Sequence, residues 1–459
     1  MENKHININS GLELSEDRLK TDSLILQAEE SRQNSPKTAL DLCAQALLIA
    51  EKISYTEGLA RINFIAGICS RSLSDFEMAL SYYRRAGEIY NILGNVSGES
   101  KVINSIANVY YNKSDYANAL DNYKKTLKIV ENAGDEAFKA TVLANIALAY
   151  QAQENIGQAI EWALESLKIY EDLKQDVPHS LLNNIGIIYQ EIGDYSTSLN
   201  YFAKALKIEE AEKNIADMSF TLGNMGVSYS YLDDNINAVE YLNRSLLLLR
   251  ETGNVQAMSS IYTYLGNAYK KLGSYNQAIP CYYKSLKYSR EINDKSSVAS
   301  ILNEFGETYL MLKDYKTAKE YFDESLQIAI DINDEIHQVK NYTSLAVLYS
   351  AFKDMDKISG FLDKAIQLAE LRKSYREISN LYRIYSSAYR KNGDYYNSML
   401  YHDKHNECEK KSLYFDKVSK IQKVSKDISI NGKNGNREKS LYHTAAASTN
   451  GKYAGSGVL

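Results

Sequence analysis

Hydrophobic residues recur at helical spacing along most of this chain, in pairs of segments that are separated by a short polar turn. One pair runs from Asn183 to Tyr189, through the turn Gly193-Asp194-Tyr195, and on to Phe202. Apolar residues lie three and four positions apart on both sides of the turn. The pattern therefore predicts a hairpin of two helices.

The hairpin pattern repeats with a nearly constant period. Tyrosines recur at steps of 40, 39, 40, 40, 40, 40 and 40 residues: Tyr110, Tyr150, Tyr189, Tyr229, Tyr269, Tyr309, Tyr349 and Tyr389. Three residues before them stand small residues: Ala107, Ala147, Gly186, Gly226, Gly266, Gly306, Ala346 and Ser386. Nine residues after them stand Ala119, Ala159, Ser198, Ala238, Ala278, Ala318, Ile358 (the exception) and Ser398. A fixed period of this length is typical of a solenoid of stacked units.

The turns predict where the helices end and begin. Gly193, Gly273 and Gly393 suit the left-handed residue that ends a first helix. Six side chains are expected to cap the second helices: Asp75, Asp115, Asp194, Ser274, Asp314 and Asp394. The small residues allow two helices to approach closely, and we expect the repeat tyrosine to fill the space beside them. Leucine at Gly186 should overpack this crossing and cost about 1–3 kcal/mol or more.

The small-x-x-Tyr, Gly-Asp-Tyr, Ala and Tyr/Phe positions resemble the tetratricopeptide repeat, usually written with a 34-residue period. The longer period is similar to that of kinesin light chains, of adaptor proteins with Asn-Leu-Gly-Asn motifs, and of bacterial peptide-sensing regulators. The resemblance covers roughly residues 17–408 and implies an all-α, right-handed superhelical solenoid of about ten hairpins. It implies little about function, because one architecture serves many partners.

The two ends depart from the repeat. Residues 1–16 are polar and predicted to be a disordered N-terminus. Residues 409–430 predict an amphipathic helix with Tyr414, Val418, Ile421 and Ile428 on one stripe, either a cap on the last hairpin or a linker. Between residues 409 and 440 nine Lys or Arg face four Asp or Glu. Residues 431–459 are predicted to be a disordered tail.

Composition narrows the class of partner and the compartment. The net charge of −5 and pI near 5.9 argue against a surface that binds nucleic acid. Four widely spaced cysteines argue against a disulfide framework and favour a reducing cytosol. No signal peptide and no apolar run of about 18 residues is visible. We therefore expect a soluble cytoplasmic protein that binds neither nucleic acid nor membrane; its oligomeric state stays open.

Motifs for catalysis or cofactors are not evident. The chain contains no phosphate-binding Gly-rich loop and no His-Glu-x-x-His sequence. His402, His405 and Cys408 share a helix face and have side chains that can bind zinc. They also occupy repeat columns that pack the core elsewhere, made more polar as an end cap requires. We favour the packing interpretation, and expect no metal, no cofactor and no catalytic residues.

Asparagines gather on the first helices, close to the small residue. In the resembled families similar positions line a concave groove and clamp the backbone of a bound peptide, since an amide both donates and accepts hydrogen bonds. Alternatively, some asparagines bridge neighbouring first helices. Tyr111, Tyr231, Lys270 and Lys271 would add specificity to the groove. The predicted groove residues are Asn104, Asn108, Asn145, Asn183, Asn184, Asn224, Asn267 and Asn303.

Two functions follow from this interpretation. The first is a non-enzymatic scaffold that binds a partner peptide or helix in the groove. The second is a regulatory or peptide-sensing input module of a bacterial signalling system, because similar arrays precede histidine kinases or nucleotide cyclases. An enzyme is a distant third.

Overall fold

The computed structural model describes residues 3–412, and within them all regular structure is α-helical. The first ten helices are α1 (Asn3–Ser31), α2 (Pro36–Lys52), α3 (Thr56–Ser72), α4 (Phe76–Ile92), α5 (Val96–Asn112), α6 (Tyr116–Ala133), α7 (Glu136–Ala152), α8 (Ile156–Asp172), α9 (His179–Ile192) and α10 (Tyr195–Glu212). The next nine are α11 (Ile215–Tyr231), α12 (Asn235–Thr252), α13 (Val255–Lys271), α14 (Tyr275–Glu291), α15 (Lys295–Met311), α16 (Tyr315–Asp331), α17 (Glu335–Ser350), α18 (Met355–Leu371) and α19 (Tyr375–Lys391). A last helix spans 395–412.

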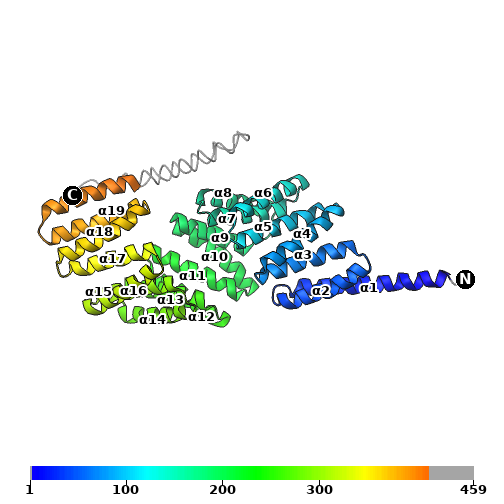
Figure 1. Ribbon diagram of the computed structural model, residues 1–459, viewed down its shortest axis with the longest axis horizontal. Helices are drawn as coiled ribbons and strands as arrows, with labels where there is room; N and C mark the ends of the chain where they lie inside the picture. Colours follow the sequence, from blue (N-terminus) through cyan, green and yellow to red (C-terminus); the bar gives the residue numbers. More distant parts are fainter. Residues whose placement is uncertain (1–2, 413–459) are drawn as a thin grey trace, which may run out of the picture. The chain divides into compact units, whose positions relative to one another are not determined.

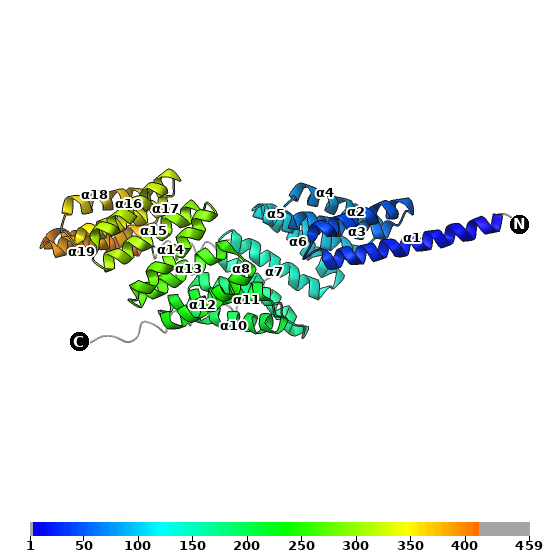
Figure 2. The same cartoon turned by 90° about the horizontal axis from the view of Figure 1, so that it is seen from below.

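Consecutive helices pair into hairpins, in which odd-numbered helices are first helices and even-numbered helices are second helices (Figures 1 and 2). The helix over 395–412 is the second helix of the hairpin that α19 begins. The fold is thus an all-α solenoid of ten hairpins, as predicted. Contacts divide the chain into two compact units, Met1–Leu248 and Leu249–Leu459, and each is described by itself below.

Turn chemistry explains most helix boundaries. The carboxylates of Asp75, Asp115, Asp194, Asp314 and Asp394 each accept a hydrogen bond from a main-chain N–H in the first turn of a second helix. Ser274 makes no such side-chain bond, so its predicted capping role is wrong. The glycines predicted to end first helices have positive φ, 88° at Gly193. Other turns place Ser, Lys or Asn in the same left-handed position, which the glycine rule misses.

The core contains a second correction. A Cβ added to Gly186 would lie 2.6 Å from the Phe202 ring, so the side chain that fills the helix crossing comes from the second helix, sixteen residues later. The repeat tyrosine lies elsewhere: Tyr189 stacks on Tyr201 with ring centroids 5.7 Å apart. Small residues at the crossing are therefore required, as predicted, but the partner is the buried aromatic side chain rather than the repeat tyrosine.

The predicted boundaries at the two ends stay predictions. Helix α1 begins at Asn3, inside the 1–16 segment. The last helix continues past residue 408 as far as 412 without a break. The rest of the predicted 409–430 helix and the 431–459 tail lie outside the described residues.

Candidate functional site: the polar face of the first helices

All eight predicted groove asparagines lie on first helices, at positions six, five or two residues before the repeat tyrosine. Within each unit, we call the surface formed by these positions, together with the position one residue after the tyrosine, the first-helix face. Its asparagines fall into three groups: those that bond to other buried polar side chains of the solenoid, those held by a tyrosine, and those whose amide has no hydrogen bond in the described residues.

Two asparagine contacts bridge neighbouring first helices. In the first unit the Asn145 amide on α7 donates to Asn104 Oδ1 on α5 over 3.2 Å. In the second unit Asn303 on α15 is fully buried and donates to Asn341 Oδ1 on α17 over 2.8 Å. The three predicted residues Asn104, Asn145 and Asn303 are thus engaged inside the solenoid, which is the bridging role that the sequence left open.

Asn183 belongs to a buried polar cluster between α9, α10 and α11. Its amide donates to Glu209 Oε1 over 2.7 Å and accepts from the Thr221 hydroxyl over 3.0 Å. His179 Nδ1 lies 3.4 Å from the same Glu209 oxygen. Glu209 is fully buried, and this burial raises the pKa of its carboxyl, although bonds from Thr221 and Asn183 and the nearby His179 oppose the shift.

Asn108 and Asn267 are oriented by tyrosines of their own hairpins. The Tyr123 hydroxyl donates to Asn108 Oδ1 over 2.5 Å, and the Tyr282 hydroxyl donates to Asn267 Oδ1 over 2.7 Å. Each tyrosine is buried, so the amide supplies an acceptor for a hydroxyl that water does not reach. Because the oxygen is occupied, each amide directs its N–H₂ donors away from the tyrosine.

Asn184 and Asn224 form the third group. They are half-buried, on the adjacent first helices α9 and α11, at the same position of the repeat. Within residues 16–412 neither side-chain amide has a hydrogen-bond partner. The main-chain carbonyl of Asn224 accepts from Gln190 over 3.1 Å, which fixes the backbone but leaves the amide open.

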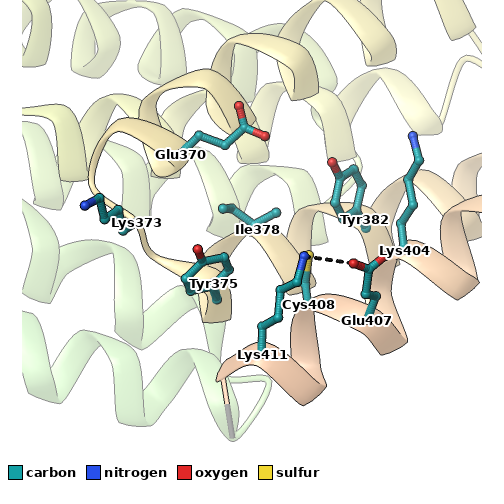
Figure 3. A pocket seen from close by; sticks show the side chains of 9 residues that line it. All are labelled: Glu370, Lys373, Tyr375, Ile378, Tyr382, Lys404, Glu407, Cys408 and Lys411. Atoms are coloured by element: carbon teal, nitrogen blue, oxygen red, sulfur yellow. Dashed lines mark ion pairs between the residues drawn. The ribbon is translucent and has the colours of Figure 1, made fainter. Parts of the chain in front are cut away.

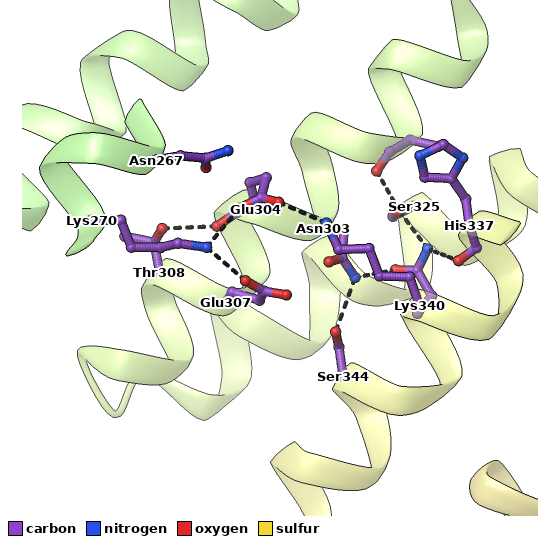
Figure 4. A network of polar contacts seen from close by, with 12 residues as sticks. Asn267, Lys270, Asn303, Glu304, Glu307, Thr308, Ser325, His337, Lys340 and Ser344 are labelled. Carbon is purple, nitrogen blue, oxygen red and sulfur yellow. Dashed lines mark hydrogen bonds and ion pairs between the residues drawn. The ribbon is translucent and has the colours of Figure 1, made fainter. Parts of the chain in front are cut away.

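The second unit adds charged residues to the first-helix face (Figure 4). Lys270 on α13 contacts Glu304 and Glu307 on α15, each over 2.6 Å. Glu304 also accepts from Lys340 on α17 over 2.7 Å. One buried carboxylate thus connects three first helices.

Burial and pairing act in opposite directions on this cluster. Burial disfavours the charged form of Glu304, but Lys340 and Lys270 outweigh it and hold the pKa of this carboxyl well below its ordinary value. Burial likewise lowers the pKa of Lys270, but Glu304 and Glu307 raise it above its ordinary value. Both residues are therefore charged at neutral pH, so Lys270 is an internal ion-pair partner before any ligand arrives.

The last hairpin contains an open cavity of about 500 Å³ between α19 and the helix over 395–412, with Tyr375, Tyr382 and Cys408 in its wall (Figure 3). Burial raises the pKa of the Cys408 thiol, which keeps it protonated and a poor nucleophile. His405 Nδ1 lies 2.8 Å from the Ser379 hydroxyl. Within residues 16–412 no group of three His, Cys, Asp or Glu side chains is arranged to hold a metal ion.

Comparison with known proteins agrees with the hairpin geometry. A tetratricopeptide-repeat profile matches residues 99–172 and 257–331, which cover α5–α8 and α13–α16. A second profile of this repeat matches residues 179–212, which cover α9 and α10. The chain is a tetratricopeptide-repeat (TPR) protein. No curated protein matches it.

Solved structures similar to this TPR protein include sensors. The quorum sensor NprR from B. thuringiensis, in its apo form, is 17% identical, with 74% of this chain and 99% of NprR covered and a TM-score of 0.55. A STAND signal-transduction ATPase with a tetratricopeptide repeat sensor, from Pyrococcus horikoshii, is 16% identical, with 89% of this chain and 65% of that chain covered and a TM-score of 0.56. At these identities the likeness shows the fold alone. In the described residues of this TPR protein, no helix is long and apolar enough to cross a membrane.

Sequence reasoning missed the carboxylates of the first-helix face. Glu304 and Glu307 occupy positions that carry asparagine in other repeats, and they lie 34 and 37 residues after Lys270. That spacing places opposite charges on adjacent first helices, so it was a usable signal for the ion pairs.

Proposed function

We propose that this TPR protein is a non-enzymatic scaffold that binds a peptide or helix of a partner protein across the first-helix face. The observation that carries the proposal is the pair of half-buried amides at Asn184 and Asn224, which lie on adjacent helices and have no partner among the described residues. A half-buried amide without a partner is poorly satisfied by the protein itself, and a peptide main chain supplies both a donor and an acceptor.

The tyrosine-held amides support the same function. The donors of Asn108 and Asn267 are preoriented, which reduces the entropy lost when a partner carbonyl binds. Asn104, Asn145, Asn183 and Asn303 belong to this proposal only as supports, because their amides bond within the solenoid.

The test compares two pairs of substitutions. The first is Asn184→Ala with Asn224→Ala, and the second is Asn104→Ala with Asn145→Ala, both in the first unit. A partner is first isolated by affinity capture from the native cytosol, and its binding segment is then titrated as a synthetic peptide. Each lost hydrogen bond typically weakens binding by ~0.5–1.5 kcal/mol, so the first pair should reduce affinity about 5- to 150-fold and leave the melting curve unchanged.

The second pair should lower the melting temperature and affect binding less, because these residues bond to each other. The reverse assignment, in which Asn184 and Asn224 change stability while binding persists, would show that the partner binds elsewhere.

A regulatory sensing module is the second candidate. The similarity to a quorum sensor and to a repeat sensor favours it, and on this function the captured partner would be a small signalling peptide rather than a folded protein. Size-resolved analysis of what the array captures separates the two candidates.

A further inference from the structure

Three positions of the first helices carry side chains that reach the next first helix. They lie thirteen and six residues before the repeat tyrosine and one residue after it. The contacts run forward along the chain in both units: Ser296 to Asp334, Asn303 to Asn341, Gln151 to Glu191, Gln190 to Ser228, and Lys270 to Glu304 and Glu307.

On α19 all three positions hold arginine: Arg376, Arg383 and Arg390. In the seven preceding hairpins that carry the repeat tyrosine these positions hold no arginine, and their only basic residue is Lys270; the hairpin of α3 and α4, which has Ser70 in place of the tyrosine, has Arg71 at the last of them. The three arginines are exposed, and within residues 16–412 none forms an ion pair with a carboxylate. The Arg383 guanidinium donates to Asn380 Oδ1 of its own helix over 2.7 Å, which steadies it without neutralising it.

The second helix of the same hairpin is also unpaired on this side. Met399 is 69% exposed and stands ten residues after the repeat tyrosine. At that position in earlier hairpins Leu120 and Ile279 pack against the following first helix. We call the surface formed by Arg376, Arg383, Arg390 and Met399 the end face. No first helix covers it in the part of the chain that the structure describes.

The repeat itself indicates which side chains a helix would need in order to cover the end face. Lys270, which occupies the position of Arg390, binds two glutamates three residues apart on one helix. A helix with carboxylates at that spacing and an apolar stripe would therefore complement the arginines and Met399. The chain's own segment 409–440 is a poor occupant, because nine basic residues face four acidic ones and would be repelled.

We propose that the end face binds an acidic amphipathic helix of a partner protein, which stacks on α19 and the helix over 395–412 as a further first helix would. This interaction is separate from peptide binding at the first-helix face of the first unit. It places a second recognition surface at the C-terminal end of the array.

The probe is a fluorescein-labelled, helix-stabilised peptide with the sequence of residues 295–311, which carries Glu304 and Glu307 and already acts as a following first helix in the fold. Anisotropy titration of the full chain should show saturable binding. Arg383→Ala combined with Arg390→Ala should weaken it by about tenfold or more, since hydrogen bonds between charged groups are the strong ones. A peptide with Glu304→Gln and Glu307→Gln should bind with similarly reduced affinity. The two losses of affinity should not add when the changed peptide is titrated into the changed chain.

The matched control is Arg84→Ala with Arg85→Ala, two arginines on α4 in the other unit, which removes the same charge and should bind the peptide normally. Asn184→Ala with Asn224→Ala should also bind it normally, so this test stands independently of the peptide groove. Circular dichroism confirms that each variant is folded.

Three results would overturn the proposal. The first is the absence of peptide binding, or a peptide affinity that is unchanged by Arg383→Ala combined with Arg390→Ala. The second is tight binding of a labelled DNA duplex through Arg383 and Arg390, which would make the surface a phosphate site. The third is a gain in peptide affinity of about tenfold on removal of residues 413–459, which would make the chain's own tail the occupant.

Discussion

Replacement of Glu304 by glutamine should uncouple three first helices at once. The side chain is 10% exposed and accepts from both Lys270 and Lys340. Removal of one partner from a buried ion pair typically costs about 3–5 kcal/mol, because the other charge is stranded. Here Lys270 keeps Glu307, and Lys340 is 36% exposed, so water replaces part of the lost contact. We therefore expect the free energy of unfolding to fall by about 2–3 kcal/mol, at or below the lower end of that range.

Hydrogen–deuterium exchange of peptides from α13, α15 and α17 is the suitable assay, because the hairpins of a solenoid can open separately. At pH 7 the expected loss corresponds to about 30- to 150-fold faster exchange in these helices. The control is Glu324→Gln, which removes a half-exposed pair with Arg290 and should change the stability by less than about 1 kcal/mol.

The pH dependence follows from the directions of the pKa shifts. The pKa of Glu304 is lowered in the folded state, so its stabilisation is present above the unfolded-state pKa and is lost as the pH falls through the folded-state pKa. The pKa of Lys270 is raised, so its contribution is lost only as the pH rises above its ordinary alkaline range. The difference between wild type and Glu304→Gln should be constant near neutrality and shrink below about pH 4. Exchange that matches the Glu324→Gln control would refute this account of the cluster.

Three further substitutions test the packing at a glycine and the burial of a carboxylate. Gly186→Ala should destabilise the hairpin by about 1–3 kcal/mol, because the new Cβ meets the Phe202 ring. Its control is Gly157→Ala, where nothing lies within 4 Å of the new Cβ and helix α8 should be stabilised by up to about 1 kcal/mol. Thermal melts of both variants measure the contrast, and equal shifts in melting temperature would contradict it. Glu209→Gln should raise the melting temperature at pH 7 by about 2–4 °C. Because the folded-state pKa of Glu209 is raised, the penalty of its charged form disappears as the pH falls, so melts at pH 4.5 should bring wild type and variant together; a gap that widens in acid would refute the burial effect.

The periodic part of the fold could be predicted from the sequence, because each column reports one contact repeated many times. Gly193 and Asp194 predict a turn from local chemistry alone, and the structure confirms the left-handed glycine and the capping carboxylate. The partner of Gly186 could not be identified in this way. Tyr189 and Phe202 are both aromatic and both periodic, and only the geometry of the crossing decides which ring fills it.

The candidate site was harder to predict, because its asparagines share a pattern but not an environment. Asn183 and Asn184 are adjacent in the sequence, yet one is bonded to Glu209 and the other has no partner in the described residues. The two asparagines differ because a buried carboxylate lies beside Asn183, not because of any property of the asparagine itself. For the arginines of α19 the sequence is more informative. They break the pattern of residues at three positions of the repeat, and this difference can be interpreted once the structure shows that these positions contact the next first helix.

The pairing of Tyr123 with Asn108, and of Tyr282 with Asn267, makes the two helices of each of these hairpins depend on each other. In both hairpins the second helix contributes a phenol and the first helix an amide, whereas Phe202 is matched with Ile187 and Tyr83 with Ile68. Someone who builds new arrays from these hairpins can exchange whole pairs freely. A phenol combined with isoleucine would bury a hydroxyl group without this acceptor, and the asparagine would lose its fixed orientation. The smallest unit for recombination is therefore a complete hairpin rather than a single helix.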